Sequence, residues 1–128
     1  MTFVDTNVFM YAVGRRHPHR DPAQEFFKAS ARDRTPLCTS AEVVQEMLHA
    51  YVPVGRLQTL DAALALLAGS GVDVWPLEYE DVTLARQFRD THPGLGAREL
   101  CHLASCRRRG VKQIKTFDQA LDAVSGNR

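Results

Sequence analysis

Short apolar strands alternate with helical segments along this chain, and this alternation most constrains its fold. Strand character is found in "TFVD" (2–5), "PLCTS" (36–40), "VDVWPL" (72–77) and "KQIKTF" (112–117). Helical patterns separate these strands, and glycine or proline often follows them. Strands that alternate with helices predict an α/β protein whose parallel sheet is covered by helices on both faces.

The expected helices follow from apolar periodicity and from capping residues. The 128 residues contain no repeat, low-complexity stretch or long linker, so we expect a single domain, 1–128. Asp21 and Pro22 are expected as the N-cap and first residue of the second helix. The predicted helices are Thr6–Val13, Pro22–Arg32, Ala41–Tyr51, Leu57–Ala68, Glu80–Thr91, Ala97–Arg109 and Gln119–Val124.

Composition narrows the setting of the protein. No apolar run is long enough to cross a membrane, and the N-terminus lacks the features of a secretory signal. Three cysteines without a signal indicate reduced thiols, so we expect a soluble cytoplasmic protein with no membrane contact. Cys101, His102 and Cys106 do not match the usual spacing of zinc ligands, and no fourth ligand is evident.

Acidic residues follow two of the predicted strands. Asp5 follows the first strand and Asp118 the fourth, and each precedes a helix. Either one alone fits an N-cap, because a carboxylate there accepts bonds from free amide hydrogens. Together they also fit a ligand site, because parallel sheets bind ligands beyond the carboxyl ends of their strands.

The helix expected over Ala41–Tyr51 offers two further carboxylates. On a helical projection, Glu46 falls about 40° outside the apolar arc, next to Ala50. Glu42 falls further into the polar face, where we expect a solvated side chain. If one of these glutamates faces a cleft, it should therefore be Glu46.

The first turn of the helix expected from Ala97 carries Glu99, which borders the apolar stripe of that helix. Glu99 fits a favourable interaction with the helix dipole, and it also fits a position near the sheet. His102 lies one turn later and could contact such a site, although a packed or surface histidine is the commoner case. Arg107–Arg109 suit the end of a helix and also contact with nucleic acid.

Four segments in this order, "FVDTNVFMYAV", "TSAEVVQEML", "ARELCHLASCRRRGV" and "IKTFDQAL", carry a family resemblance. The chain resembles PIN-domain ribonucleases, and most closely the VapC toxins of bacterial toxin–antitoxin pairs, from Thr2 to about Val124. The resemblance implies a three-layer α/β/α sandwich and a metal-dependent endoribonuclease that leaves 5′-phosphate and 3′-hydroxyl ends. It also implies an RNA substrate, a cognate antitoxin protein of the VapB kind and a homodimer.

The resemblance also assigns residues. The implied metal-binding and catalytic acids are Asp5, Glu46, Glu99 and Asp118, and Glu99 departs from the family's usual aspartate. Carboxylates suit the hard cations Mg²⁺ or Mn²⁺, which activate water and screen phosphate charge. Thr6, Asn7 and Thr116 match polar neighbours that orient carboxylates or contact phosphate, although capping would also explain them. The loop carrying Arg15, Arg16 and Arg20 is the candidate for RNA contact.

Two other functions fit part of the pattern. A phosphatase could use Asp5 as its nucleophile on a similar sheet, but such enzymes usually carry a second aspartate where this chain has Asn7. A non-catalytic PIN-like module that binds RNA or protein is the other alternative. A covalent aspartyl phosphate would identify the first alternative, and metal-dependent RNA cleavage would exclude the second.

Overall fold

The computed structural model describes residues 1–126 and places a four-stranded parallel sheet at the centre of the protein. The strands are β1 (Thr2–Val4), β2 (Leu37–Ser40), β3 (Asp73–Trp75) and β4 (Gln113–Lys115). Their order is β3-β2-β1-β4, so β1 lies between β2 and β4. Phe3 is paired with Cys38 on one side and Ile114 on the other.

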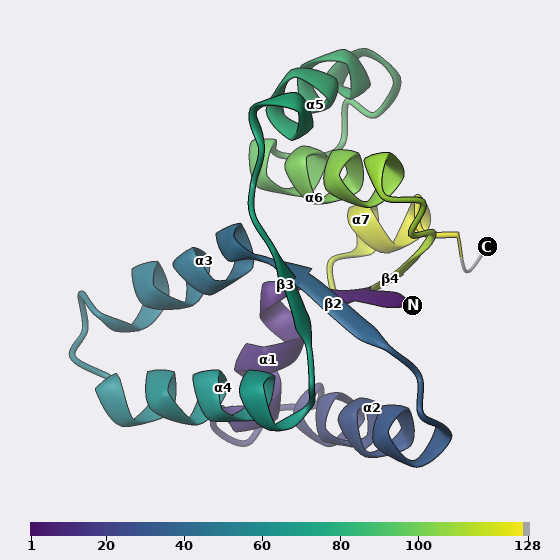
Figure 1. Ribbon diagram of the computed structural model, residues 1–128. Helices are drawn as coiled ribbons and strands as arrows, with labels where there is room; N and C mark the ends of the chain where they lie inside the picture. Colours follow the sequence, from purple (N-terminus) through teal and green to yellow (C-terminus); the bar gives the residue numbers. More distant parts are fainter. Residues whose placement is uncertain (127–128) are drawn as a thin grey trace.

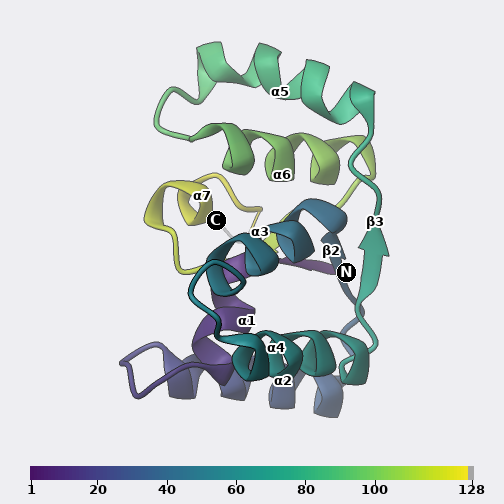
Figure 2. The same cartoon turned by 90° about the vertical axis from the view of Figure 1, so that its left-hand side faces the viewer.

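Helices connect the strands and cover both faces of the sheet, as expected for an α/β/α sandwich. Figure 1 shows α5 and α6 on one side of the sheet and α1, α2 and α4 on the other, and Figure 2 shows the same layers from the side. The helices are α1 (Thr6–Val13), α2 (Arg20–Asp33), α3 (Ala41–Tyr51), α4 (Leu57–Gly69), α5 (Tyr79–Thr91), α6 (Ala97–Arg108) and α7 (Gln119–Ala123).

The core forms because the central strands β1 and β2 are buried on both faces, as parallel strands between two helical layers must be. Phe3 and Val4 in β1 are fully buried, and so is Val8 in α1. The Phe3 ring lies 5.9 Å from the Trp75 ring and 5.3 Å from the His102 ring, measured between centroids. His102 on α6 therefore packs against Phe3 in the central strand β1.

The predicted elements are all present, with one error in capping and shorter strands than expected. Helix α2 begins at Arg20 after His19, so Asp21 lies inside the first turn and is not the N-cap. The strand expected over 72–77 spans only Asp73–Trp75, because the chain then turns into the capping box of α5. No helix within residues 1–126 is long and apolar enough to cross a membrane.

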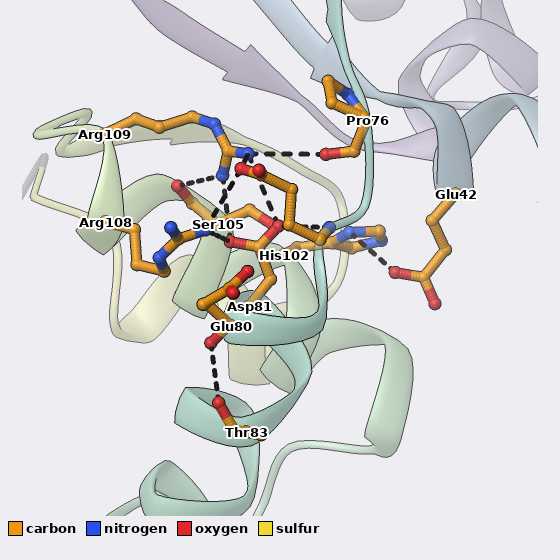
Figure 3. A network of polar contacts seen from close by, with 10 residues as sticks. Glu42, Pro76, Glu80, Asp81, Thr83, His102, Ser105, Arg108 and Arg109 are labelled. Atoms are coloured by element: carbon orange, nitrogen blue, oxygen red, sulfur yellow. Dashed lines mark hydrogen bonds and ion pairs between the residues drawn. The ribbon is translucent and has the colours of Figure 1, made fainter.

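An ion-pair network around the buried Asp81 joins α5 to the end of α6. Asp81 is fully buried and accepts bonds from Arg108 (2.7 Å) and Arg109 (3.0 Å), as Figure 3 shows. The Asp81 carboxylate also accepts from the Glu78 amide, and the Arg109 guanidinium lies over the Trp75 ring. Arg108 and Arg109 therefore contribute to the packing of α5 against α6. The sequence alone had also allowed them a role in nucleic-acid contact.

Candidate functional site

The candidate site lies at the carboxyl edge of the sheet, where β1 and β4 end side by side. Asp5 follows β1, Thr116 follows β4, and the Asp5 amide donates to the Lys115 carbonyl. Helix α3 starts directly after β2 and brings Glu46 to the same edge. The parallel arrangement thus brings together side chains that are far apart in the sequence.

Asp5 is both a helix cap and a member of the site. Its Oδ1 accepts from the Thr6 amide at 2.7 Å, which caps α1, and its Oδ2 accepts from the Thr116 hydroxyl at 2.7 Å. The side chain is buried, and burial raises the pKa of this carboxyl despite the opposing effects of His102 and the two hydrogen bonds. A buried carboxylate at this edge favours a bound cation or a shared proton.

Thr6, Asn7 and Thr116 hold the acids in place. The Thr6 hydroxyl donates to Glu46 Oε2 at 3.0 Å. The Asn7 side chain donates to the Thr116 hydroxyl and accepts from the Phe117 amide. These bonds fix the orientation of Asp5 relative to the chain that follows β4, so the three residues act as supports of the carboxylates.

Glu46 on α3 contacts Thr6 and His102, and its side chain is 17% exposed. Its Oε1 lies 3.2 Å from His102 Nε2, and His102 Nε2 lies 3.6 Å from Asp5 Oδ1. Burial would raise the pKa of Glu46, but His102 and the Thr6 hydroxyl outweigh it and lower that pKa. The surroundings therefore favour the charged form of Glu46, whereas burial disfavours the charged form of Asp5.

His102 lies in the centre of this arrangement and is 1% exposed. Burial would lower its pKa, but the hydrogen bond with Glu46 and the charges of Asp5, Glu46 and Glu42 outweigh burial and raise it. From the sequence, His102 could either contact the site or be a packed or surface histidine, and the second option was the commoner case. Its position one turn after Glu99, on the buried face of α6, was the only signal of site contact.

Glu42 was expected in solvent, and that expectation is wrong. Its Oε2 is buried, has no hydrogen-bond partner and lies 3.8 Å from His102 Nδ1, and Figure 3 shows the side chain directed at the imidazole. Burial raises the pKa of Glu42. The projection of α3 alone placed Glu42 on a polar face, but α6 supplies a histidine against that face.

Glu99 and Asp118 lie at the starts of α6 and α7. Asp118 Oδ1 accepts from the Leu121 amide and caps α7. The carboxylate of Glu99 packs closely against Gly96. A Cβ atom added at residue 96 would lie only 2.7 Å from Glu99 Oε2. The charge of Glu99 also acts to raise the pKa of Glu42. Within residues 1–126, no group of three or more His, Cys, Asp or Glu side chains is arranged so that it could hold a metal ion.

Four exposed arginines are candidates for phosphate contact: Arg15, Arg16, Arg20 and Arg98. Arg98 is exposed in the first turn of α6, and its charge acts to lower the pKa of both Glu42 and Glu46. The sequence reasoning missed Arg98, although it directly precedes Glu99. Arg15 and Arg16 are exposed in the loop after α1, and Arg20 is exposed at the start of α2. Cys38, Cys101 and Cys106 are free, buried thiols.

The fold and the site together define an α/β/α sandwich protein with an acidic site at the carboxyl edge of its parallel sheet. The PIN domain family model matches residues 2–127. The chain is 60% identical to Ribonuclease VapC23 of Mycobacterium tuberculosis over 94% of its own length and 95% of that protein. It is 33% identical to Ribonuclease VapC13 of the same species, over 98% and 96%. The chain therefore belongs to the PIN domain family and, within it, to the VapC proteins.

Solved structures agree on the fold. The structure of Mycobacterium tuberculosis VapC20, described as a toxin that cleaves the sarcin–ricin loop, superposes with a TM-score of 0.80 at 18% identity, over 96% of this chain and 94% of that one. VapBC2 from Rickettsia felis, bound to a DNA fragment from its promoter, gives a TM-score of 0.73 at 13% identity, over 96% and 92%. At these identities the likeness concerns the fold alone.

Proposed function

We propose that this protein is a divalent-metal-dependent endoribonuclease and the toxin of a toxin–antitoxin pair. The observation that carries the proposal is the convergence of Asp5 and Glu46 at the carboxyl edge of the sheet, both oriented by threonine hydroxyls. Family membership supports the same reaction, because the relatives that match over nearly the whole chain are named ribonucleases.

The donor set fits Mg²⁺ or Mn²⁺ in kind. The candidate ligands are carboxylate oxygens, which hard divalent cations prefer. The buried Asp5 carboxyl, whose pKa burial raises, is a group that a nearby cation would stabilise in its charged form. Asp5 and Glu46 would hold the ion, with Glu99 and Asp118 as the further acids of the set. When bound, such an ion lowers the pKa of a water molecule and screens the charge on the scissile phosphate.

The protein's own residues bind and orient. Thr116 and the Thr6 amide hold the Asp5 carboxylate in one rotamer, and the Thr6 hydroxyl holds Glu46. Arg98, in the first turn of α6, offers a cation to a phosphate, and Arg15, Arg16 and Arg20 offer further ones. Four carboxylates near one phosphate would repel it, so these cations are needed for RNA to approach.

The setting follows from the same family. Structural neighbours include a toxin–antitoxin complex from Klebsiella pneumoniae (TM-score 0.71, 14% identity) and the VapBC2 assembly. We infer that this chain binds a cognate antitoxin of the VapB kind, forms a homodimer and acts in the cytoplasm.

A cleavage assay with purified protein tests the proposal. We expect cleavage of RNA in the presence of Mg²⁺ or Mn²⁺ and none in EDTA. An unchanged rate in EDTA would refute the metal mechanism, and no cleavage under any metal would favour a binding module. A stable aspartyl phosphate on Asp5 would instead identify a phosphatase.

A further inference from the structure

Four rings gather beside the acidic site, and we call them the aromatic stack: Tyr11, His17, His19 and Phe117. His17 stacks on Tyr11 with centroids 4.5 Å apart and planes 29° apart. His19 stacks on Phe117 at 4.4 Å and 16°, and Tyr11 meets Phe117 edge-on at 5.5 Å. His17 is exposed, whereas the other three rings are half-buried. The stack therefore ends in a ring that is open to solvent.

The aromatic stack is tied to the acidic site through Asn7. Tyr11 lies one turn after Asn7 on α1, and the Phe117 amide donates to Asn7 Oδ1 at 3.1 Å. Asn7 also donates to Thr116, which donates to Asp5. The Asn7 side chain and the Thr116 hydroxyl thus connect the Phe117 amide to the Asp5 carboxylate.

The surroundings of the stack are cationic. The Lys115 ammonium lies over the Phe117 ring, 5.1 Å from its centroid. In the sequence, Arg15, Arg16 and Arg20 flank the two histidines, and the nearest acids along the chain are Asp21 and Asp118. Aromatic faces among cations match single-stranded nucleic acid, whose bases stack on rings while its phosphates pair with cations.

We propose that the aromatic stack binds one unpaired base of the RNA substrate next to the scissile phosphate. The base extends the Tyr11–His17 stack on the exposed face of His17, and the neighbouring arginines contact the adjoining phosphates. This inference rests on the proposed ribonuclease function and adds to it a subsite for an unstacked base. Stacking is tolerant of base identity, so the subsite selects unpaired RNA and not a particular base.

Two substitutions of the exposed His17 separate its ring from its hydrogen bond. His17 Nδ1 accepts from the His19 amide at 3.0 Å. His17→Asn keeps an acceptor and removes the ring, whereas His17→Phe keeps a ring and removes the acceptor. Tyr79→Asn is the control, because Tyr79 is an exposed aromatic residue on α5.

Binding is measured in EDTA with a short single-stranded RNA that carries 2-aminopurine, whose fluorescence is quenched on stacking. We expect wild type, His17→Phe and Tyr79→Asn to bind and quench alike. His17→Asn should bind about fivefold more weakly or worse and lose the quenching, since base–aromatic stacking contributes at least that much. An oligonucleotide that is abasic at every position should bind all four proteins equally, because it has no base to stack on the ring.

The outcomes separate this inference from the proposed function. Equal binding and quenching by wild type and His17→Asn would overturn the base subsite, even if the wild type cleaves RNA. Equal losses in His17→Asn and His17→Phe would also overturn it, because the loop bond and not the ring would then matter. Unchanged RNA binding with weaker antitoxin binding would assign the stack to the protein partner. Ring-dependent quenching without any cleavage would support the subsite and refute the nuclease.

Discussion

His102 on α6 contacts Glu46 on α3 through a 3.2 Å contact between its Nε2 and the Glu46 Oε1. The same imidazole lies 3.6 Å from Asp5 and 3.8 Å from Glu42. Three carboxylates from two segments of the chain thus face one buried histidine. Burial would lower the pKa of His102, but these carboxylates raise it, and a protonated imidazole at this position would offset their mutual repulsion.

Replacing His102 with leucine should destabilise the metal-free protein by about 2–4 kcal/mol, because the carboxylates lose their only buried counter-group among residues 1–126. Added Mg²⁺ should recover part of this loss if the acids bind metal. Urea melts with and without Mg²⁺ measure both effects. His49→Leu, at an exposed position on α3, is the control and should change stability by no more than about 0.5 kcal/mol.

Glu46→Gln should reduce RNA cleavage by about 100-fold or more, which is the usual effect of losing one electrostatic group from a catalytic site. Glu42→Gln should keep the cleavage rate within about tenfold of the wild-type rate. The reason is that Glu46 shares His102 with Asp5 and is held by Thr6, whereas Glu42 faces the far nitrogen of the imidazole. Initial rates at saturating Mg²⁺ compare the two. Equal losses would mean that Glu42 belongs to the ligand set.

Asp5→Asn tests whether the N-cap role or the site role of Asp5 dominates. Asparagine caps about as well as aspartate, and the change removes a buried charge, so the metal-free variant should be as stable as wild type or more stable. Added Mg²⁺ should raise its melting temperature less than that of wild type, and cleavage should be lost. An active variant with the full Mg²⁺ shift would leave Asp5 as a cap only.

Glu99 should be replaceable by aspartate with measurable cleavage retained, whereas Glu99→Gln should lose most of it. The side chain lies in the first turn of α6, near enough for its charge to act on Glu42, so charge should matter more than length. The comparison of rates between the two variants is the measurement. Full activity of the glutamine variant would show that Glu99 serves only the helix dipole.

The Asp81 network predicts how stability depends on pH. Burial would raise the pKa of Asp81, but the bonds from the Glu78 amide, Arg108 and Arg109 outweigh it and lower that pKa below its ordinary value of 3.8. A lowered pKa means that the network stabilises the fold fully above about pH 4 and loses this contribution as the pH falls through the lower folded-state value. Asp81→Asn should cost about 2 kcal/mol or more at pH 7.

The difference between wild type and Asp81→Asn should shrink as the pH falls below about 4, because the wild-type carboxylate then takes up a proton. Urea melts at pH 7, 5, 4 and 3 measure it. Asp90→Asn, which removes a pair between side chains that are 73% and 75% exposed, is the control and should cost about 0.5 kcal/mol or less at every pH. A constant Asp81 difference down to pH 3 would contradict the assignment.

Local patterns determined which elements this chain forms. The alternation of strands and helices, the caps at Asp5 and Asp118 and the helix Ala41–Tyr51 are all present, because each depends on residues that are close in the sequence. The phase of one helix predicted that Glu46 and not Glu42 would face a cleft, whereas the structure places both side chains against His102. The parallel sheet then placed Asp5 and Thr116 at one edge by geometry alone.

Only the tertiary structure decided what lies against these elements. The projection of α3 could not show that α6 places His102 against Glu42, because packing between helices depends on the whole sheet. The same holds for Asp81, whose burial depends on two arginines from the end of α6, and for the rings that α1 and the chain after β4 bring together. Periodicity shows which face of a helix is apolar, but the neighbour on its polar face is set by long-range packing.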